Sequence, residues 1–243
     1  MKSLLLLLIV VSLVSGLVAQ APSAGTLSEE FQLGSRSVKV PAPDGFMGAF
    51  TRFDKIAERM IATEDAGNEV LTVHLPASEF PKFEANQDQD LDLYTKVSVS
   101  KRVKTLDISP SMFADVVSAS EKQIVALLGP NSDIFKRVEG NTGKGLTELW
   151  GNETTVRINE PKYLGFFEKG TDTLSFMMSM NFDINNRKFS ILNTTSFVRA
   201  NNRVLFIYTY KRNPIAGDIE KLRSLASKWT KEIRDANKTP SQK

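Results

Sequence analysis

LSFMMSMNF (residues 174–182), KFSILNTTSFVR (188–199) and RVLFIYTYK (203–211) follow one another near the carboxyl end of the chain. The last stretch is especially rich in β-branched and aromatic residues over Val204–Tyr208, a composition that favours strands. Asn185-Asn186 and Asn201-Asn202 separate the three stretches, and two-residue turns of this kind are typical of β-hairpins. The three stretches therefore predict an antiparallel meander, around which the other elements are placed.

Helices are predicted both before and after this meander. Over residues 218–237 the apolar residues recur at spacings of three and four, which places them on one face of a helix. Ser109 and Pro110 are typical of a helix start, so we expect a helix over 110–128. A third helix is predicted over 50–63.

Further strands are predicted where apolar and polar residues alternate. They cover residues 38–40, 69–75 and 94–103. The segment 131–170 has less pattern, and we expect only short strands there, around Leu146–Trp150 and Val156–Ile158. Strands that largely follow one another, with helices between the early ones and at the end, indicate an α+β fold. We expect a mainly antiparallel sheet covered by helices, in an α/β/α sandwich.

Two parts of the chain resemble the Mog1/PsbP-like domains. One is Pro43-Asp44-Gly45-Phe46, which is similar to the opening of such domains. The other is the apolar strand Arg203–Lys211 followed by the terminal helix Asp218–Asn237. The resemblance covers residues 36–236 in the order of elements. It implies an α/β/α sandwich that acts as a non-catalytic accessory or binding module.

The first nineteen residues have the layout of a secretory signal peptide. Lys2 supplies one positive charge, and a mostly apolar run from Leu4 to Val14 follows, too short for a membrane span. Cleavage is expected after Ala19, because a later cut would place Pro22 directly after the scissile bond. The alternative is an uncleaved anchor, which the polar residues that follow disfavour. We therefore expect export to a periplasmic or extracellular location.

Four segments are predicted along the chain. They are a signal peptide at 1–19, a flexible linker at 20–34, a single α+β domain at 35–237 and a disordered tail at 238–243. A mature chain of roughly 220 residues is long enough to bury a core without covalent cross-links. The sequence contains no cysteine, which excludes disulfides, thiolate metal sites and cysteine nucleophiles.

The charge of the chain is nearly balanced but unevenly distributed. The formal net charge is +3. This balance argues against nucleic acid as a partner and against stable membrane insertion after signal removal. Residues 64–92 hold eight acids and one base, whereas residues 199–243 hold eleven bases and four acids. The two segments are either solvated surfaces or the ends of a charge dipole that orients the protein toward a charged partner.

Asp88, Asp90 and Asp92 stand at alternate positions, like the first ligands of an EF-hand calcium loop. Leu93 stands where that loop needs glycine, and Val99 where it needs the closing glutamate. The three aspartates are therefore a calcium candidate, beside the simpler interpretation as a solvated acidic loop. We expect no other metal site and no cofactor.

No complete catalytic set is present in the sequence. His74 is the only histidine, and no Gly-x-Ser-x-Gly nucleophile elbow accompanies it, so we expect a polar strand residue. The segment 140–145, GNTGKG, is superficially similar to a phosphate loop. It lacks the leading glycine and has Gly145 where a magnesium-binding serine or threonine would stand. We expect a mobile turn there and no catalytic residue.

Phe206, Tyr208 and Tyr210 lie two residues apart in a predicted strand, so they share one face of it. Their rings either pack into the core or form an aromatic recognition surface. The leading hypothesis is an exported, soluble, non-catalytic binding or accessory protein for a protein partner or an envelope component. The alternatives are a secreted hydrolase that uses carboxylates and a carrier of a small ligand.

Overall fold

The structure is a computed structural model that describes residues 28–85, 90–127 and 133–238. The strands are β1 (Ser28–Leu33), β2 (Arg36–Pro41), β3 (Phe46–Gly48), β4 (Asn68–Pro76), β5 (Leu93–Ser100), β6 (Val156–Lys169), β7 (Thr173–Ile184), β8 (Arg187–Ala200) and β9 (Arg203–Arg212). The helices are α1 (Asp54–Ala62), α2 (Phe80–Glu84), α3 (Pro110–Leu127), α4 (Asp133–Trp150) and α5 (Asp218–Ala236), with a 3-10 turn at Ala77–Glu79. The predicted signal peptide lies outside the described residues.

Seven of the described strands form one antiparallel sheet in the order β3-β4-β5-β9-β8-β7-β6. The predicted meander is confirmed as β7, β8 and β9, with Asn185-Asn186 and Asn201-Asn202 at its two turns. All four asparagines have positive φ angles, from 44° to 69°. A type I′ turn needs positive φ at both central residues, and asparagine tolerates this conformation better than most residues.

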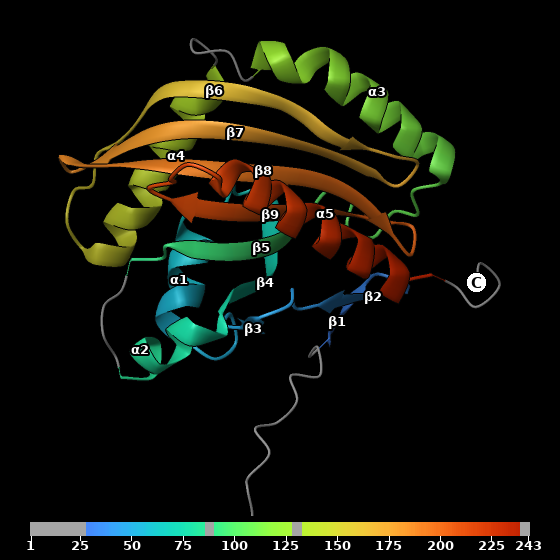
Figure 1. The fold of residues 1–243 in the computed structure, drawn as a ribbon, viewed down its shortest axis with the longest axis horizontal. Coiled ribbons are helices and arrows are strands. Elements are labelled where there is room, and N and C mark those ends of the chain that lie inside the picture. The colour runs from blue at the N-terminus through green and yellow to red at the C-terminus, as the bar shows by residue number, and fades with distance from the viewer. Residues whose placement is uncertain (1–27, 86–89, 128–132, 239–243) are drawn as a thin grey trace, which may run out of the picture.

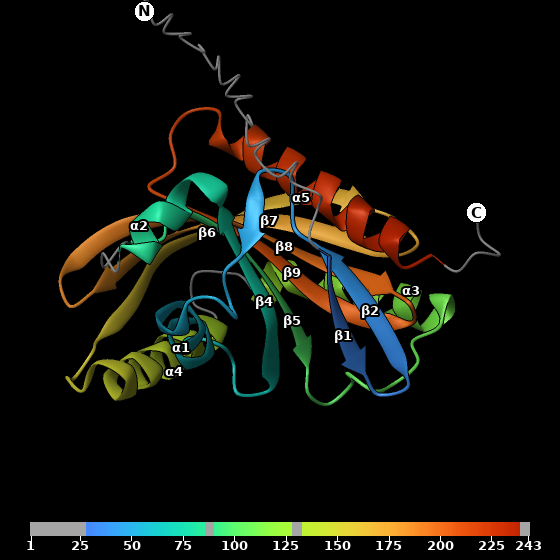
Figure 2. The ribbon, with the colours of Figure 1, turned by 90° about the horizontal axis from the view of Figure 1, so that it is seen from below.

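Both faces of this sheet are covered (Figure 1). Helix α5 and the β1–β2 hairpin lie on one face, which we call the α5 face. Helices α1, α3 and α4 lie on the other, the α4 face, as the view in Figure 2 shows. The expected α+β class, an antiparallel sheet covered by helices, is therefore confirmed.

A cluster of buried apolar residues holds α5 and the hairpin against the sheet. Its members come from β1, β2, β4, β5, β8, β9 and α5, and they include Val38, Val97, Leu205, Trp229 and Ile233. The fully buried indole of Trp229 donates a hydrogen bond of 2.7 Å to the carbonyl oxygen of Pro41. Each large apolar side chain buried in this way contributes roughly 2 kcal/mol. The hairpin and α5 therefore depend on the same core.

Part of the predicted linker is a strand. The prediction of a flexible segment over 20–34 is wrong for Ser28–Leu33, which pairs with β2 as strand β1. The more buried positions of this strand are Glu29, Phe31 and Leu33. Only two of these are apolar, so the alternation was too short to identify the strand from the sequence.

The glycine-rich segment 140–145 is part of helix α4 and not the predicted turn. A β-carbon at Gly145 would lie 1.7 Å from the carbonyl oxygen of Ala62 in α1. A β-carbon at Gly143 would lie 3.0 Å from the carbonyl oxygen of Thr154. Glycine is needed here because two backbones approach closely, a tertiary requirement that local patterns do not reveal.

The rest of the segment 131–170 also differs from expectation. Leu146–Trp150 belongs to helix α4, and β6 is much longer than the predicted strand at Val156–Ile158. Irregular pairing with β7 interrupts the alternation of β6, where Glu160 and Gly165 have positive φ angles of 49° and 96°. These bulges remove the period-two pattern on which a strand prediction depends.

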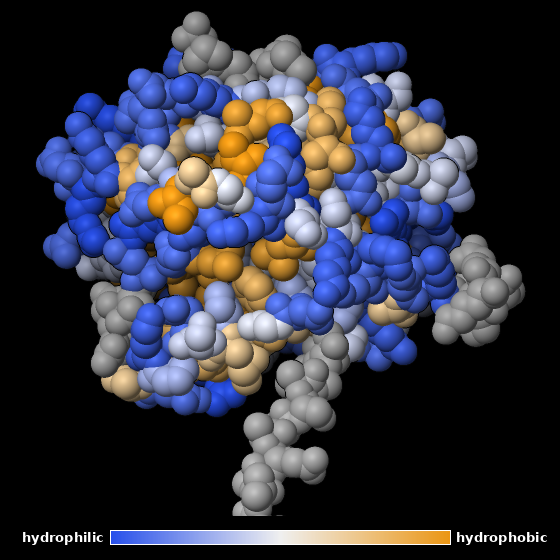
Figure 3. Space-filling model, in the orientation of Figure 1, coloured by the Kyte–Doolittle hydropathy of each residue, from blue (hydrophilic) through white to orange (hydrophobic). Residues whose placement is uncertain are grey.

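The outer side of α5 is hydrophilic, and hydrophobic surface is visible beside it (Figure 3). A shallow hollow of about 460 Å³ lies between β6 and α5, with Phe166, Phe167 and Arg223 in its lining. Within the described ranges, no helix is both long and apolar enough to cross a membrane.

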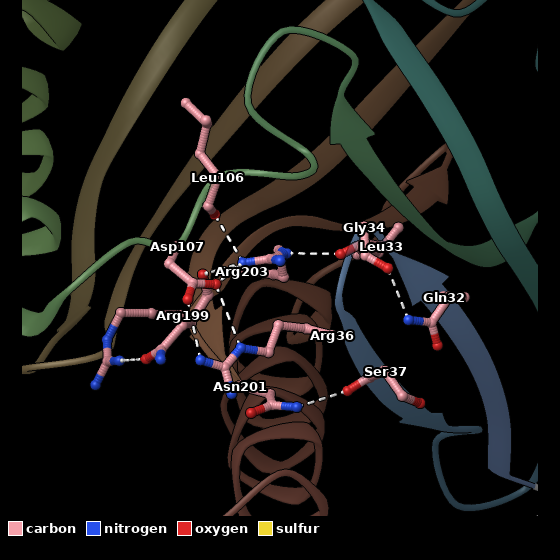
Figure 4. A network of polar contacts seen from close by, with 11 residues as sticks. Gln32, Leu33, Gly34, Arg36, Ser37, Leu106, Asp107, Arg199, Asn201 and Arg203 are labelled. Atoms are coloured by element: carbon pink, nitrogen blue, oxygen red, sulfur yellow. Dashed lines mark hydrogen bonds and ion pairs between the residues drawn. The ribbon is translucent and has the colours of Figure 1, made fainter.

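A fully buried arginine joins three segments at one end of the sheet (Figure 4). Arg203 begins β9, and its Nε donates to the carbonyl of Leu33 in β1 at 2.9 Å. Its Nη1 donates to the carbonyl of Leu106 at 2.9 Å and to the carboxylate of Asp107, both before α3. Hydrogen bonds from Arg36 and Arg203 lower the pKa of Asp107 to about 2. The charged network therefore ties β1, β9 and the start of α3 together.

Replacing Arg203 with methionine should lower the free energy of unfolding by about 3 kcal/mol, because the hydrogen bonds of one buried side chain to Leu33, Leu106 and Asp107 are lost together. Urea unfolding of R203M and the unaltered protein measures this difference. Arg187→Met is the control, since its ion pair with Asp90 is exposed and should contribute about 0–1 kcal/mol. Equal losses in the two variants would contradict the role given to Arg203.

Candidate functional site: an aromatic surface on the sheet

The α4 face of the sheet carries rows of residues that stand directly opposite one another on adjacent strands. Such residues lie close enough for their side chains to contact. The rows, written in the order β5, β9, β8, are Tyr94–Tyr210–Asn193, Lys96–Tyr208–Thr195 and Ser98–Phe206–Phe197. The four aromatic residues Tyr94, Phe206, Tyr208 and Tyr210, from β5 and β9, are called the aromatic surface below.

The three tyrosine rings of the aromatic surface contact one another in a series, and Phe206 contacts a ring of the next strand. Tyr94 and Tyr210 stack with ring centroids 4.6 Å apart and planes at 15°. Tyr208 and Tyr210, neighbours on the same side of β9, have centroids 6.0 Å apart at 24°. Phe206 meets Phe197 of β8 edge to face at 5.5 Å. All four residues of the aromatic surface are partly buried, so each keeps some contact with solvent.

A buried ion pair lies beside these rings. The ammonium of Lys96 is 2.7 Å from Oε2 of Glu64, and their side chains are only 9% and 8% exposed. The same ammonium lies 4.8 Å from the ring centroid of Tyr208 and 5.8 Å from that of Tyr210. A cation at this distance is attracted to the ring face. Lys96 therefore connects the rings of β9 to Glu64, which follows helix α1.

The electrostatic surroundings keep these groups in their ordinary charge states. Burial disfavours the Lys96 ammonium, but the Glu64 carboxylate and the Tyr208 ring outweigh it and raise the pKa of Lys96. Burial also raises the pKa of Tyr94, Tyr208 and Tyr210, and the Glu64 charge raises that of Tyr210 further. The three phenols are protonated and Lys96 is charged at neutral pH.

This arrangement is suited to recognition and poorly suited to proton transfer. A general base should have a pKa near the working pH, and these tyrosines are shifted away from it. The charge of Lys96 is already engaged by Glu64. What remains partly accessible is a set of four flat rings, three of which carry hydroxyl groups; such rings can stack on apolar groups, and the hydroxyls can exchange hydrogen bonds.

The shared face of Phe206, Tyr208 and Tyr210 follows the predicted alternation, whereas their use in binding stays a prediction. The sequence reasoning missed Tyr94 and Lys96. Both lie in the predicted strand 94–103, two residues apart, so their common face was visible in the sequence. The pairing of that strand with β9 was not visible, because the two are far apart along the chain.

The calcium candidate is only partly covered by the described residues. Asp88 lies outside them. Asp90 forms ion pairs with Arg187 and Arg212, and Asp92 with Lys211. No cluster of three or more acidic, histidine or cysteine side chains that could hold a metal occurs in the part of the chain that the structure describes. The two described carboxylates thus face cationic side chains, and calcium binding remains an untested prediction.

His74 is enclosed on the α5 face. Its ring is fully buried and meets Trp229 edge to face at 5.5 Å. Nδ1 lies 3.3 Å from the hydroxyl of Thr95, and Nε2 lies 3.4 Å from a carboxylate oxygen of Glu29 in β1. Burial disfavours the Glu29 carboxylate, but the neighbouring His74 and Thr72 outweigh it and lower the pKa of Glu29. His74 thus helps to hold the β1–β2 hairpin.

Comparisons with known proteins give a weak likeness among solved structures. No protein-family model and no curated protein matches the sequence. Among solved structures, the chain is similar to a mutant of the protein Mog1 and to the Ran-binding protein Mog1p of Saccharomyces cerevisiae. Both are 11% identical, with TM-scores of 0.31 and 0.30, and the matches cover 86% of this chain and 88% and 89% of theirs. A weak Mog1-like resemblance is confirmed at this level.

Removing one partner of the Lys96–Glu64 pair should be more damaging than removing both. Glu64→Leu should lower the free energy of unfolding by about 3 kcal/mol, because it leaves a buried ammonium without its carboxylate. Adding Lys96→Met should recover part of this loss. Urea unfolding of both single variants and the double variant measures the coupling. The exposed pair Lys82–Glu79 is the control, with a coupling of about 0.5 kcal/mol or less. Additive losses at Glu64 and Lys96 would refute the predicted coupling.

The contact of Glu29 with His74 predicts a pH-dependent contribution to stability. Because the pKa of Glu29 is lowered from 4.5 by folding, its contribution is present above pH 4.5 and disappears as pH falls through the folded-state pKa. The difference in unfolding free energy between the unaltered protein and Glu29→Gln should shrink accordingly. Urea unfolding across this pH range measures it, with the exposed neighbour Glu30→Gln as control. A difference that does not change with pH would rule out this linkage.

Proposed function

We propose that this chain is an exported, non-catalytic binding protein that recognises a protein partner through its aromatic surface. The observation that carries the proposal is the stacked series Tyr94–Tyr210–Tyr208, at centroid distances of 4.6 and 6.0 Å. Tyrosine provides a large contact area at little cost in conformational entropy, and it is enriched at protein interfaces.

The state of the reactive side chains supports a binding role. His74 is enclosed between Glu29, Thr95 and Trp229. Lys96 is bound to Glu64, and the tyrosines keep their protons at neutral pH. His74 and Lys96 are therefore engaged in structural contacts, whereas the tyrosines remain partly accessible.

The proposed location rests on the first nineteen residues, whose layout is that of a cleavable signal. After cleavage behind Ala19 the mature chain would begin at Gln20 and act in a periplasmic or extracellular location. A partner there would be an exported protein or an envelope protein. Such a partner would place apolar or aromatic side chains against the tyrosine rings.

Photocrosslinking at position 208 tests this proposal. A benzophenone amino acid in place of Tyr208 keeps an aromatic ring at the surface. In cells that make the full-length chain, the exported form should begin at Gln20 and crosslink to one dominant protein. The same photoreactive group at Ile215, which is 72% exposed between β9 and α5, is the control and should not capture that protein.

Competition separates specific from incidental capture. An excess of the unaltered mature chain, or of Ile215→Ser, should suppress the crosslink, whereas folded Tyr210→Ser should not. Equal capture from positions 208 and 215, or no capture by a folded and exported chain, would overturn the proposed binding role. A full-length chain that keeps its first nineteen residues inside the cell would overturn the proposed export.

A further inference from the structure

A polar cavity of about 560 Å³ lies near the carboxyl end of α5, beside the β6–β7 and β8–β9 turns. Five of its lining residues are cationic: Arg36, Arg199, Lys231, Arg234 and Lys238. They come from β2, β8 and the end of the chain around α5, so the fold gathers them from segments far apart in the sequence. Its volume is within the range typical of small-ligand sites.

Carboxylates fix the two arginines that come from strands. Arg199 binds Asp172 through Nε at 2.7 Å and Nη2 at 2.6 Å, and Asn202 through Nη1 at 2.8 Å. Arg36 binds Asp107 through Nε at 3.3 Å and Nη2 at 3.0 Å. Figure 4 shows both guanidinium groups beside the network of Arg203. These side chains are held in place before any ligand arrives, which lowers the entropy cost of binding.

The cations of the helix are held in a similar way. Arg234 donates through Nη2 to Glu168 at 3.2 Å. Lys231 and Lys238 share Asp235, at 2.7 and 2.6 Å. Their hydrogen bonds lower the pKa of Asp235 to about 2, so this carboxylate stays ionised under ordinary conditions.

Positive charge exceeds negative charge around the cavity. With the buried Arg203, six cationic side chains of the described residues face four carboxylates, those of Asp107, Glu168, Asp172 and Asp235. Cations near a helix carboxyl end also offset the helix dipole. That explanation does not extend to Arg36 and Arg199, which lie on strands.

Hydrogen-bond donors also remain available. Within the part of the chain that the structure describes, Arg36 and Arg234 contact protein acceptors through Nε and Nη2. This leaves Nη1 of both guanidinium groups for a ligand. Guanidinium groups match the oxygen geometry of phosphate, and they are preferred where phosphate is recognised.

We propose that this cavity binds a phosphate monoester. Two uncompensated positive charges match the charge of a phosphate monoester near neutral pH. A cavity of this size also leaves room for a small organic group beyond the phosphate. The phosphate could belong to a soluble molecule or to a lipid headgroup, since the chemistry of recognition is the same.

Binding to defined probes distinguishes these sources. Glycerol 3-phosphate and inorganic phosphate are titrated calorimetrically into the purified chain, and phosphatidylcholine vesicles with or without phosphatidic acid are used for co-sedimentation. Binding of glycerol 3-phosphate in solution supports a soluble ligand. Binding to phosphatidic acid vesicles alone supports a headgroup. Affinity should fall as salt is added in both cases.

Variants identify the cavity as the site. The double variant R36Q/R234Q should weaken binding at least tenfold. Lys228→Gln is the matched control, because Lys228 lies on the same helix, forms an ion pair with Asp44 and does not line the cavity. It should change the affinity less than twofold. Equal losses in the two variants would overturn the proposal, since they would indicate only diffuse attraction by a basic surface.

Amine acetylation tests the unaltered protein, so the result does not depend on how well a variant folds. The side chains of Lys231 and Lys228 are 70% and 59% exposed. The binding probe should slow acetylation of Lys231 and leave that of Lys228 unchanged. The proposal is abandoned if neither glycerol 3-phosphate nor phosphatidic acid vesicles protect Lys231.

Discussion

The charge of Arg203, held away from water, is the constraint on which the rest of the structure depends. A guanidinium with no solvent exposure must find its acceptors within the protein. It finds them in the carbonyls of Leu33 and Leu106 and in the carboxylate of Asp107. Because these belong to β1 and to the segment before α3, the hydrogen bonds of Nε and Nη1 fix the position of two peripheral elements on β9.

The α4 face is also covered by helices, but the tyrosines of β5 and β9 on that face stay partly exposed. The hairpin and α5 share one apolar cluster around Trp229, and the hairpin also meets the sheet through Glu29 and His74. On the α4 face, α1 and α3 meet the sheet through separate clusters, around Ile56 and Ile124. The partly exposed tyrosines of β5 and β9 lie on the same face of the sheet as these clusters. The aromatic surface is therefore partly exposed because α1 and α3 pack on separate parts of the α4 face.

Local sequence patterns predicted the helices and strands whose own residues determine their conformation. They failed where the conformation depends on contacts with segments far away in the sequence. The meander β7–β9 and helix α5 have regular periodicity, and their turns contain asparagines that adopt positive φ without tertiary help. Helix α4 was not predicted because its glycines are typical of a turn. Gly145 is needed there for the close approach of α4 to Ala62 in α1. In the same way Tyr208 and Tyr210 were identified from alternation, but the place of Lys96 beside them needed the pairing of β5 with β9, and Glu64 needed the contact of the segment after α1 with β5.

Strand β9 carries both Arg203 and part of the aromatic surface because its side chains alternate between the two faces of the sheet. Arg203, Leu205 and Ile207 belong to the α5 face, and Phe206 and Tyr208 to the other. A register shift of one residue would exchange the two sets, bringing an arginine among the rings and tyrosines against α5. The Asn201-Asn202 turn sets the register of β9 against β8, and Arg203 follows it directly. The hydrogen bonds of Arg203 can form only in this register. The contacts that hold β1 on the α5 face therefore also determine which residues of β9 lie on the α4 face.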